Sequence, residues 1–137
     1  MSTGTQRGFQ WAILVTTSLV VIGVFLQVYF IAAYIFGAGQ DALDIHKGLG
    51  NAVHVFEVLA FIAALVAYWK QWSKVAPAFA LAVVGTVQVG FAGADEWVGA
   101  FHGLLALVVL ILAHAVVQRS VRDLGLGKHS GGGATSH

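Results

Sequence analysis

The chain has 137 residues, of which 58% are hydrophobic and only 9% are charged, with a net charge of +1 at pH 7. Soluble domains carry about 25% charged residues, so this composition excludes a water-soluble domain and indicates an integral membrane protein. The sequence has no basic patch of useful size outside the ends of the predicted helices, so we expect no nucleic-acid partner. The absence of cysteine excludes disulfides, thiolate metal ligands and cysteine-linked haem.

Four apolar stretches approach the length of about 20 residues that a helix needs to cross a bilayer. They cover residues of about 11–36, 45–69, 75–91 and 97–117. Each must be helical, because a bilayer offers no water to free backbone groups. The first stretch is too long for the core of a signal peptide, so we expect it to be retained. The four tryptophans fall at span ends, as interfacial aromatic residues do: Trp11, Trp69, Trp72 and Trp97.

Short polar connections separate these stretches: Gly37–Asp44, Lys70–Lys74 and Ala92–Glu96. Such connections favour antiparallel neighbours, so we predict an all-α fold, an integral membrane antiparallel four-helix bundle over residues 1–123. Pro77 is expected in the first turn of the third helix, and Asp95 and Glu96 at the start of the fourth. The Gly-rich remainder, residues 124–137, is predicted to be a disordered cytoplasmic tail.

Basic residues gather at one end of the predicted bundle, and acidic residues at the other. The basic end holds Arg7, Lys70, Lys74, Arg119, Arg122 and Lys128, whereas Lys47 is the one basic residue near the acidic connections. The positive-inside rule then predicts that both termini are cytoplasmic, in a multi-pass protein of the cell (inner) membrane.

A short internal repeat links the two halves of the chain. The segment that starts at Gln27 (Gln-Val-Tyr-Phe) resembles the segment that starts at Gln88 (Gln-Val-Gly-Phe). Each precedes an acidic connection and then a helix with a histidine near its start, first His46 and then His102. The repeat suggests two duplicated helical hairpins that place these histidines at similar depth, near the outer face.

Other ionisable residues lie deeper in the same two helices. By the helical rise, His54 lies about 12 Å and Glu57 about 16 Å below His46, while His114 lies about 18 Å below His102. Ionisable groups are costly inside a bilayer, so their presence there indicates a functional site.

Histidine pairs on facing helices are typical ligands of a low-spin haem iron. We therefore expect one or two haem b groups, held by His46, His102, His54 and His114. The pair His46–His102 is best matched in depth, while His54–His102 and His54–His114 remain alternatives. Lys47 is placed to meet the haem propionates.

At these residues the sequence resembles one four-helix half of haem A synthase. The segment Asp44-Ile45-His46-Lys47 and the segment that runs from His102 to Ala106 look like the two histidine motifs of that family. The resemblance implies a four-helix bundle with a haem ligand near the outer end of its second and fourth helices. A looser likeness to four-helix b-type membrane cytochromes implies two haems and would recruit His54 and His114.

A second hypothesis rests on Glu57 and His54, which lie one helical turn apart and are predicted to handle protons. Under this second hypothesis the protein is a proton-coupled small-molecule transporter or an accessory subunit.

Under the first hypothesis, based on the haem ligands above, the protein is a cytochrome b-like iron protein for electron transport or haem handling, with a redox partner or quinone. Either protein could act as a homodimer or as a subunit of a larger complex. No hydrolytic or transferase motif is present, so a redox role is the one enzymatic activity that the sequence leaves open.

Overall fold

The computed structural model describes residues 3–126, and within this range the protein consists of four helices without a strand. The helices are α1 (Thr3–Ile35), α2 (Gln40–Ala67), α3 (Trp72–Phe91) and α4 (Glu96–Asp123). Each is long and apolar enough to cross a membrane. The all-helical class is therefore confirmed, and the number of helices that could cross a membrane is the predicted one. Of the predicted tail, Leu124, Gly125 and Leu126 form a turn, whereas residues 127–137 lie outside the described part.

The helices extend beyond the apolar stretches from which they were predicted. α1 begins at Thr3, α4 continues to Asp123, and α2 begins at Gln40 inside the predicted connection. The α1–α2 turn is short because Gly37 and Gly39 adopt φ angles of 94° and 86°. Glycine enters this left-handed region without the cost that a Cβ imposes, so the chain reverses at once.

The prediction that Pro77 occupies the first turn of its helix is wrong, because α3 begins at Trp72 and Pro77 lies inside it. Proline has no N–H to give to the carbonyl four residues earlier, which here belongs to Ser73. That carbonyl instead accepts a hydrogen bond from Arg119 Nη1 of α4 at 3.0 Å. The hydrogen bond that Pro77 removes from α3 is thus replaced by one between α3 and α4.

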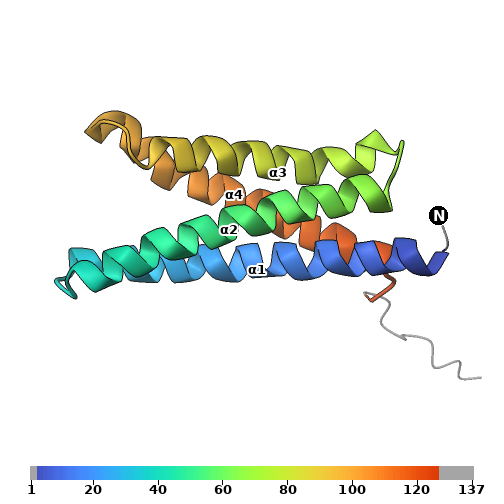
Figure 1. Cartoon of the computed structure of the whole chain (residues 1–137), viewed down its shortest axis with the longest axis horizontal. Coiled ribbons are helices and arrows are strands. Elements are labelled where there is room, and N and C mark those ends of the chain that lie inside the picture. The colour runs from blue at the N-terminus through green and yellow to red at the C-terminus, as the bar shows by residue number, and fades with distance from the viewer. Residues whose placement is uncertain (1–2, 127–137) are drawn as a thin grey trace, which may run out of the picture.

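Consecutive helices run in opposite directions, and each packs against two neighbours in the order α1, α2, α3, α4 (Figure 1). The diagonal helices α2 and α4 make no direct backbone contact. α2 starts beside α1 and ends beside α3, while α4 starts beside α3 and ends beside α1 (Figure 1). The α1–α2 and α3–α4 hairpins therefore separate toward the end that carries their turns, called the outer end below.

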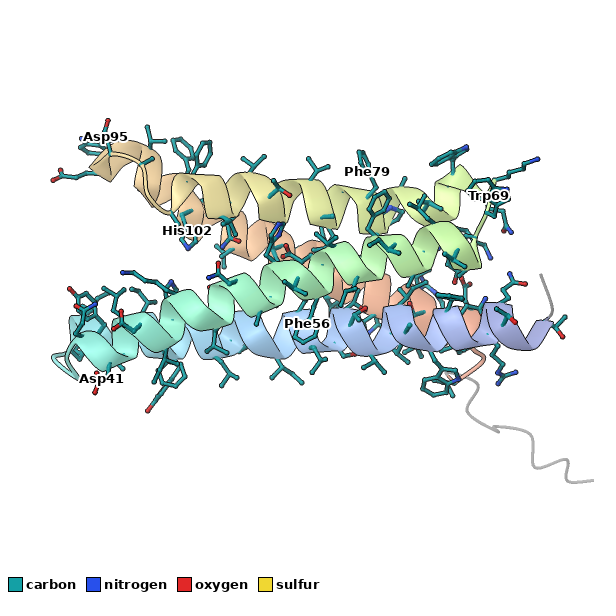
Figure 2. The ribbon with its side chains drawn as sticks, in the orientation of Figure 1. Asp41, Phe56, Trp69, Phe79, Asp95 and His102 are labelled. Carbon is teal, nitrogen blue, oxygen red and sulfur yellow. The ribbon has the colours of Figure 1, made fainter. Side chains whose placement is uncertain are left out.

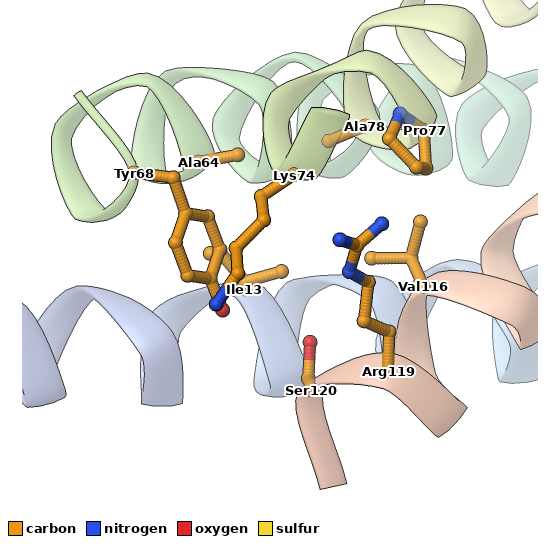
Figure 3. A pocket seen from close by; sticks show the side chains of 9 residues that line it. All are labelled: Ile13, Ala64, Tyr68, Lys74, Pro77, Ala78, Val116, Arg119 and Ser120. Carbon is orange, nitrogen blue, oxygen red and sulfur yellow. The ribbon is translucent and has the colours of Figure 1, made fainter. Parts of the chain in front are cut away.

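The opposite, inner end is tightly packed and linked by polar contacts. Tyr68 Oη donates a hydrogen bond to Asp123 Oδ2 at 2.6 Å, and Lys74 Nζ lies 3.7 Å from the same oxygen. Tyr68 and Lys74 border a cavity of about 10 Å³, enough for a single water (Figure 3). Burial, and then the hydrogen bond to Asp123, raise the pKa of Tyr68 well above its usual range. The surrounding core comprises Ile13, Ala63, Ala64, Ala67, Tyr68, Val75, Ala78 and Val116.

The core becomes sparse toward the outer end. Among residues 28–52 only Ala42 is buried, and none is buried among residues 89–108. Large apolar side chains also cover the outward faces of all four helices, including Phe25, Ile62, Phe79 and Ile111. A lipid bilayer would cover those outward faces, whereas the space between the hairpins at the outer end has no packed core of its own.

Candidate functional site

Two histidine rings face each other at the outer end. His46 comes from α2 and His102 from α4, the diagonal pair of helices, and His102 points toward the space between the hairpins (Figure 2). The two ring centroids lie 6.2 Å apart, and the ring planes make an angle of 71°. The prediction that these histidines lie at similar depth is confirmed.

Each of these rings is oriented by a backbone carbonyl of its own hairpin. His46 Nδ1 lies 3.0 Å from the carbonyl oxygen of Gln27, and His102 Nδ1 lies 2.9 Å from that of Gln88. A carbonyl only accepts, so Nδ1 donates, and the Nε2 atom of the neutral ring keeps its lone pair. No residue among 3–126 makes a hydrogen bond to either Nε2. Histidines that bind metals are commonly held in this way.

The two hairpins present their histidines in the same manner. Gln88 follows Gln27 by 61 positions, and His102 follows His46 by 56 positions, so the short repeat in the sequence corresponds to a repeated contact. In the sequence Gln27 and Gln88 mark only the starts of the repeated segments, whereas in the structure their backbone carbonyls, and not their side-chain amides, contact the histidines. Both glutamines are buried.

The spacing of the rings fits a single metal ion between them. Two metal–nitrogen bonds of about 2 Å, in line through one ion, place the centres of two imidazole rings about 6 Å apart. Within residues 3–126, no group of three or more His, Cys, Asp or Glu side chains is placed to hold a metal ion. A haem supplies four nitrogens of its own and needs only two axial ligands. The residues present therefore fit a haem better than a bare ion.

Few side chains are packed around the two histidines. His46 and His102 are half-buried, and none of residues 89–108 is buried. Phe91 and Phe101, whose ring centroids lie 6.5 Å apart, are aromatic residues of α3 and α4 near His102 in sequence.

Glu57 and His54 form a separate polar pair deeper in α2. His54 Nδ1 lies 3.0 Å from Glu57 Oε2, and the Glu57 side chain is 1% exposed while that of His54 is 27% exposed. The other carboxylate oxygen, Oε1, is buried without a hydrogen-bond partner among the described residues. Glu57 therefore lies in the core with one carboxylate oxygen bonded to His54 and the other without a partner among the described residues.

Gly85 of α3 makes room for this carboxylate. A Cβ at position 85 would overlap the Oε2 and Cδ atoms of Glu57 and come within 2.8 Å of Oε1. The sequence alone does not connect Gly85 with Glu57. The only signal was that a glycine in one helix and a glutamate in its neighbour both occur in the middle of a span.

The remaining candidate residues lie apart from the facing histidines. His114 is at an exposed position of α4, with Gln118 Nε2 3.5 Å from its Nε2. Lys47, beside His46, is exposed and forms no ion pair within residues 3–126. Of the three pairings left open by the sequence, the structure brings together His46 and His102.

Comparison of the chain with protein-family models, with curated proteins and with solved structures gives no match. The functional interpretation below therefore depends on the geometry of the chain itself.

Proposed function

We propose that the protein is a multi-pass membrane protein that binds one haem b between His46 and His102 and transfers electrons. The observation that carries the proposal is the pair of imidazole rings 6.2 Å apart, each oriented by a backbone carbonyl. The four apolar helices support insertion in the cell membrane, and the basic residues at the inner end support cytoplasmic termini.

Electron transfer follows from the proposed pair of ligands. If His46 and His102 both held a haem iron, the group would supply one-electron chemistry, exchanged with a quinone or a redox protein. The resemblance to haem A synthase supports the same ligand pair, and haem handling is the related role that it suggests.

Other groups of the chain would orient the two histidines, keep water away from the haem and bind its propionates. The carbonyl oxygens of Gln27 and Gln88 keep the proton on Nδ1 of each ligand, fix the ring orientation and raise the basicity of Nε2. The apolar walls of the helices exclude water. Lys47, exposed at the outer end beside His46, is the cation we assign to the propionates.

The visible absorption spectrum of the detergent-purified protein tests this proposal. We expect a Soret band that sharpens on reduction, and its loss in both His46→Ala and His102→Ala. Added imidazole should restore the band in each variant, because it occupies the vacated axial position. His114→Ala is the matched control, since it removes an exposed histidine from the same helix as His102 and should leave the spectrum unchanged. Protein that stays colourless after haem is added would refute the proposal.

The buried His54–Glu57 pair supports proton-coupled transport as a second candidate function. In that case the protein would be colourless, and proton flux into liposomes that contain it would depend on Glu57. Flux that persists in Glu57→Gln would exclude this candidate.

A further inference from the structure

Glu57 is the polar side chain that the proposed haem site does not explain. Its Oε1 atom is buried without a partner among residues 3–126, although burial of a carboxylate oxygen without a hydrogen bond is unfavourable. A proton on this carboxylate would remove its charge and so lower the cost of its burial. The position therefore has the chemistry of a proton-accepting site.

His54 connects this carboxylate with the surroundings of the bundle. It is bonded to Glu57 through Nδ1, yet about a quarter of its side chain remains exposed, 27%. Imidazole accepts and releases protons near neutral pH. His54 is thus suited to pass a proton to and from Glu57, whose own side chain is 1% exposed.

No other titratable group interacts with Glu57 among the described residues. From α3 it is faced by Gly85, and the only titratable residue of that helix is Lys74 near the inner end. α1 has no titratable side chain between Arg7 and Tyr29. Around Val53 and Phe56 of α2, the neighbouring helices contribute an apolar cluster: Val20, Val24, Leu81, Val109 and Ala113. Thr17 of α1 and Gln88 of α3 are buried but carry no charge. On α4 the titratable residue beside this cluster is His114, at an exposed position. Charge on the pair is therefore poorly screened by its surroundings.

We infer that His54 and Glu57 form a proton-binding site whose proton affinity rises when an electron arrives at the iron held by His46 and His102. This inference rests on the proposed function. His54 and Glu57 lie about 12 and 16 Å from His46 along the helix. One unit of charge at that separation, with an effective dielectric constant of about 20, changes proton affinity roughly tenfold.

The coupled step balances in electrons and protons. A quinol, or dithionite in the test below, is oxidised and supplies the electron that reduces ferric to ferrous iron. One proton, drawn from water, binds to the His54–Glu57 pair, which keeps the net charge of the bundle interior unchanged. No covalent bond between heavy atoms is formed or broken. Oxidation of the iron by the next acceptor releases the same proton.

The midpoint potential of the purified holoprotein, measured at a series of pH values, tests the coupling. Tenfold higher proton affinity of the reduced form corresponds to a potential lower by about 59 mV above the titration range of the pair than below it. We expect Glu57→Gln to keep the Soret band and to lose this pH dependence. Glu96→Gln is the matched control, since it removes an exposed carboxylate at the start of α4 and should keep the dependence. An equal pH dependence in Glu57→Gln and in the original protein would overturn the inference.

A second measurement does not use the potential. Redox difference infrared spectra should show a carboxylic-acid C=O band that appears on reduction and is missing in Glu57→Gln, or a band of protonated imidazole that is missing in His54→Gln. Coloured protein without either signal refutes the coupling while leaving the haem site intact. Colourless protein refutes the proposed function and with it the coupling, so the two failures are distinguishable.

Discussion

Gly85→Ala provides the sharpest test of how Glu57 is buried. The added Cβ would overlap Oε2 and Cδ of Glu57 and lie 2.8 Å from Oε1, closer than neighbouring atoms allow. The carboxylate must therefore move, and this displacement breaks the 3.0 Å hydrogen bond between its Oε2 and His54 Nδ1.

Three effects determine the expected size of the change in stability. Overpacking of a core costs about 1–3 kcal/mol, and loss of a hydrogen bond to a charged group costs about 1.5–3 kcal/mol. Alanine is favoured over glycine in a helix by about 1 kcal/mol, which acts in the opposite direction. We expect a net loss of about 3 kcal/mol in the free energy of unfolding, or on the order of a hundredfold in the equilibrium constant.

Reversible unfolding in mixed micelles with increasing dodecyl sulfate measures this loss. Gly90→Ala is the matched control, because it lies on the same helix and a Cβ there meets no atom within 4 Å. In a Glu57→Ala background the penalty of Gly85→Ala should disappear, which a double-mutant cycle detects as coupling. Equal stability of Gly85→Ala and Gly90→Ala, or additive effects in the cycle, would refute the packing argument.

Other contacts lead to further predictions. Tyr68→Phe should lower the free energy of unfolding by about 1–2 kcal/mol in the same assay, because Asp123 Oδ2 loses its 2.6 Å hydrogen bond. Because the folded state raises the pKa of Tyr68, its contribution to stability is complete below the unfolded value of about 10 and is lost as pH rises through the folded value. The temperature of thermal unfolding should therefore fall as pH rises above about 10. In Tyr68→Phe this pH-dependent fall should be smaller. Gly23→Ala should cost about 1–3 kcal/mol by contact with the Val53 side chain, and Val53→Ala should suppress that cost.

The fold was largely predictable because hydropathy determines where each helix crosses the bilayer. The four candidate spans follow from apolar length, and the matched depth of His46 and His102 follows from the short repeat that relates the two hairpins. Hydropathy does not report where a helix ends once it leaves the apolar region. This is why α1 and α4 extend to Thr3 and Asp123, beyond the predicted limits.

Contacts between helices were not predictable from one sequence. Pro77 indicates a helix start, but its effect here is to free the Ser73 carbonyl for Arg119, which depends on how α4 lies against α3. The fit of Gly85 to Glu57 likewise depends on the rotation of α3 relative to α2. Such rotations are decided by packing across the whole interface, and no local pattern encodes them.

The two hairpins are alike at the histidines and unlike below them, which separates the two proposed roles. The shift of 56 positions that relates His46 to His102 carries His54 to Leu110 and Glu57 to Ala113. The proposed ligand pair takes one histidine from each hairpin, and the histidine with its carbonyl partner occurs twice. Among residues 3–126 the buried His–Glu pair occurs once, which matches one proton for each electron. A structural role for Glu57 in helix packing would apply equally to both hairpins, whereas the buried Ala113 shows that the bundle packs at that depth without a carboxylate.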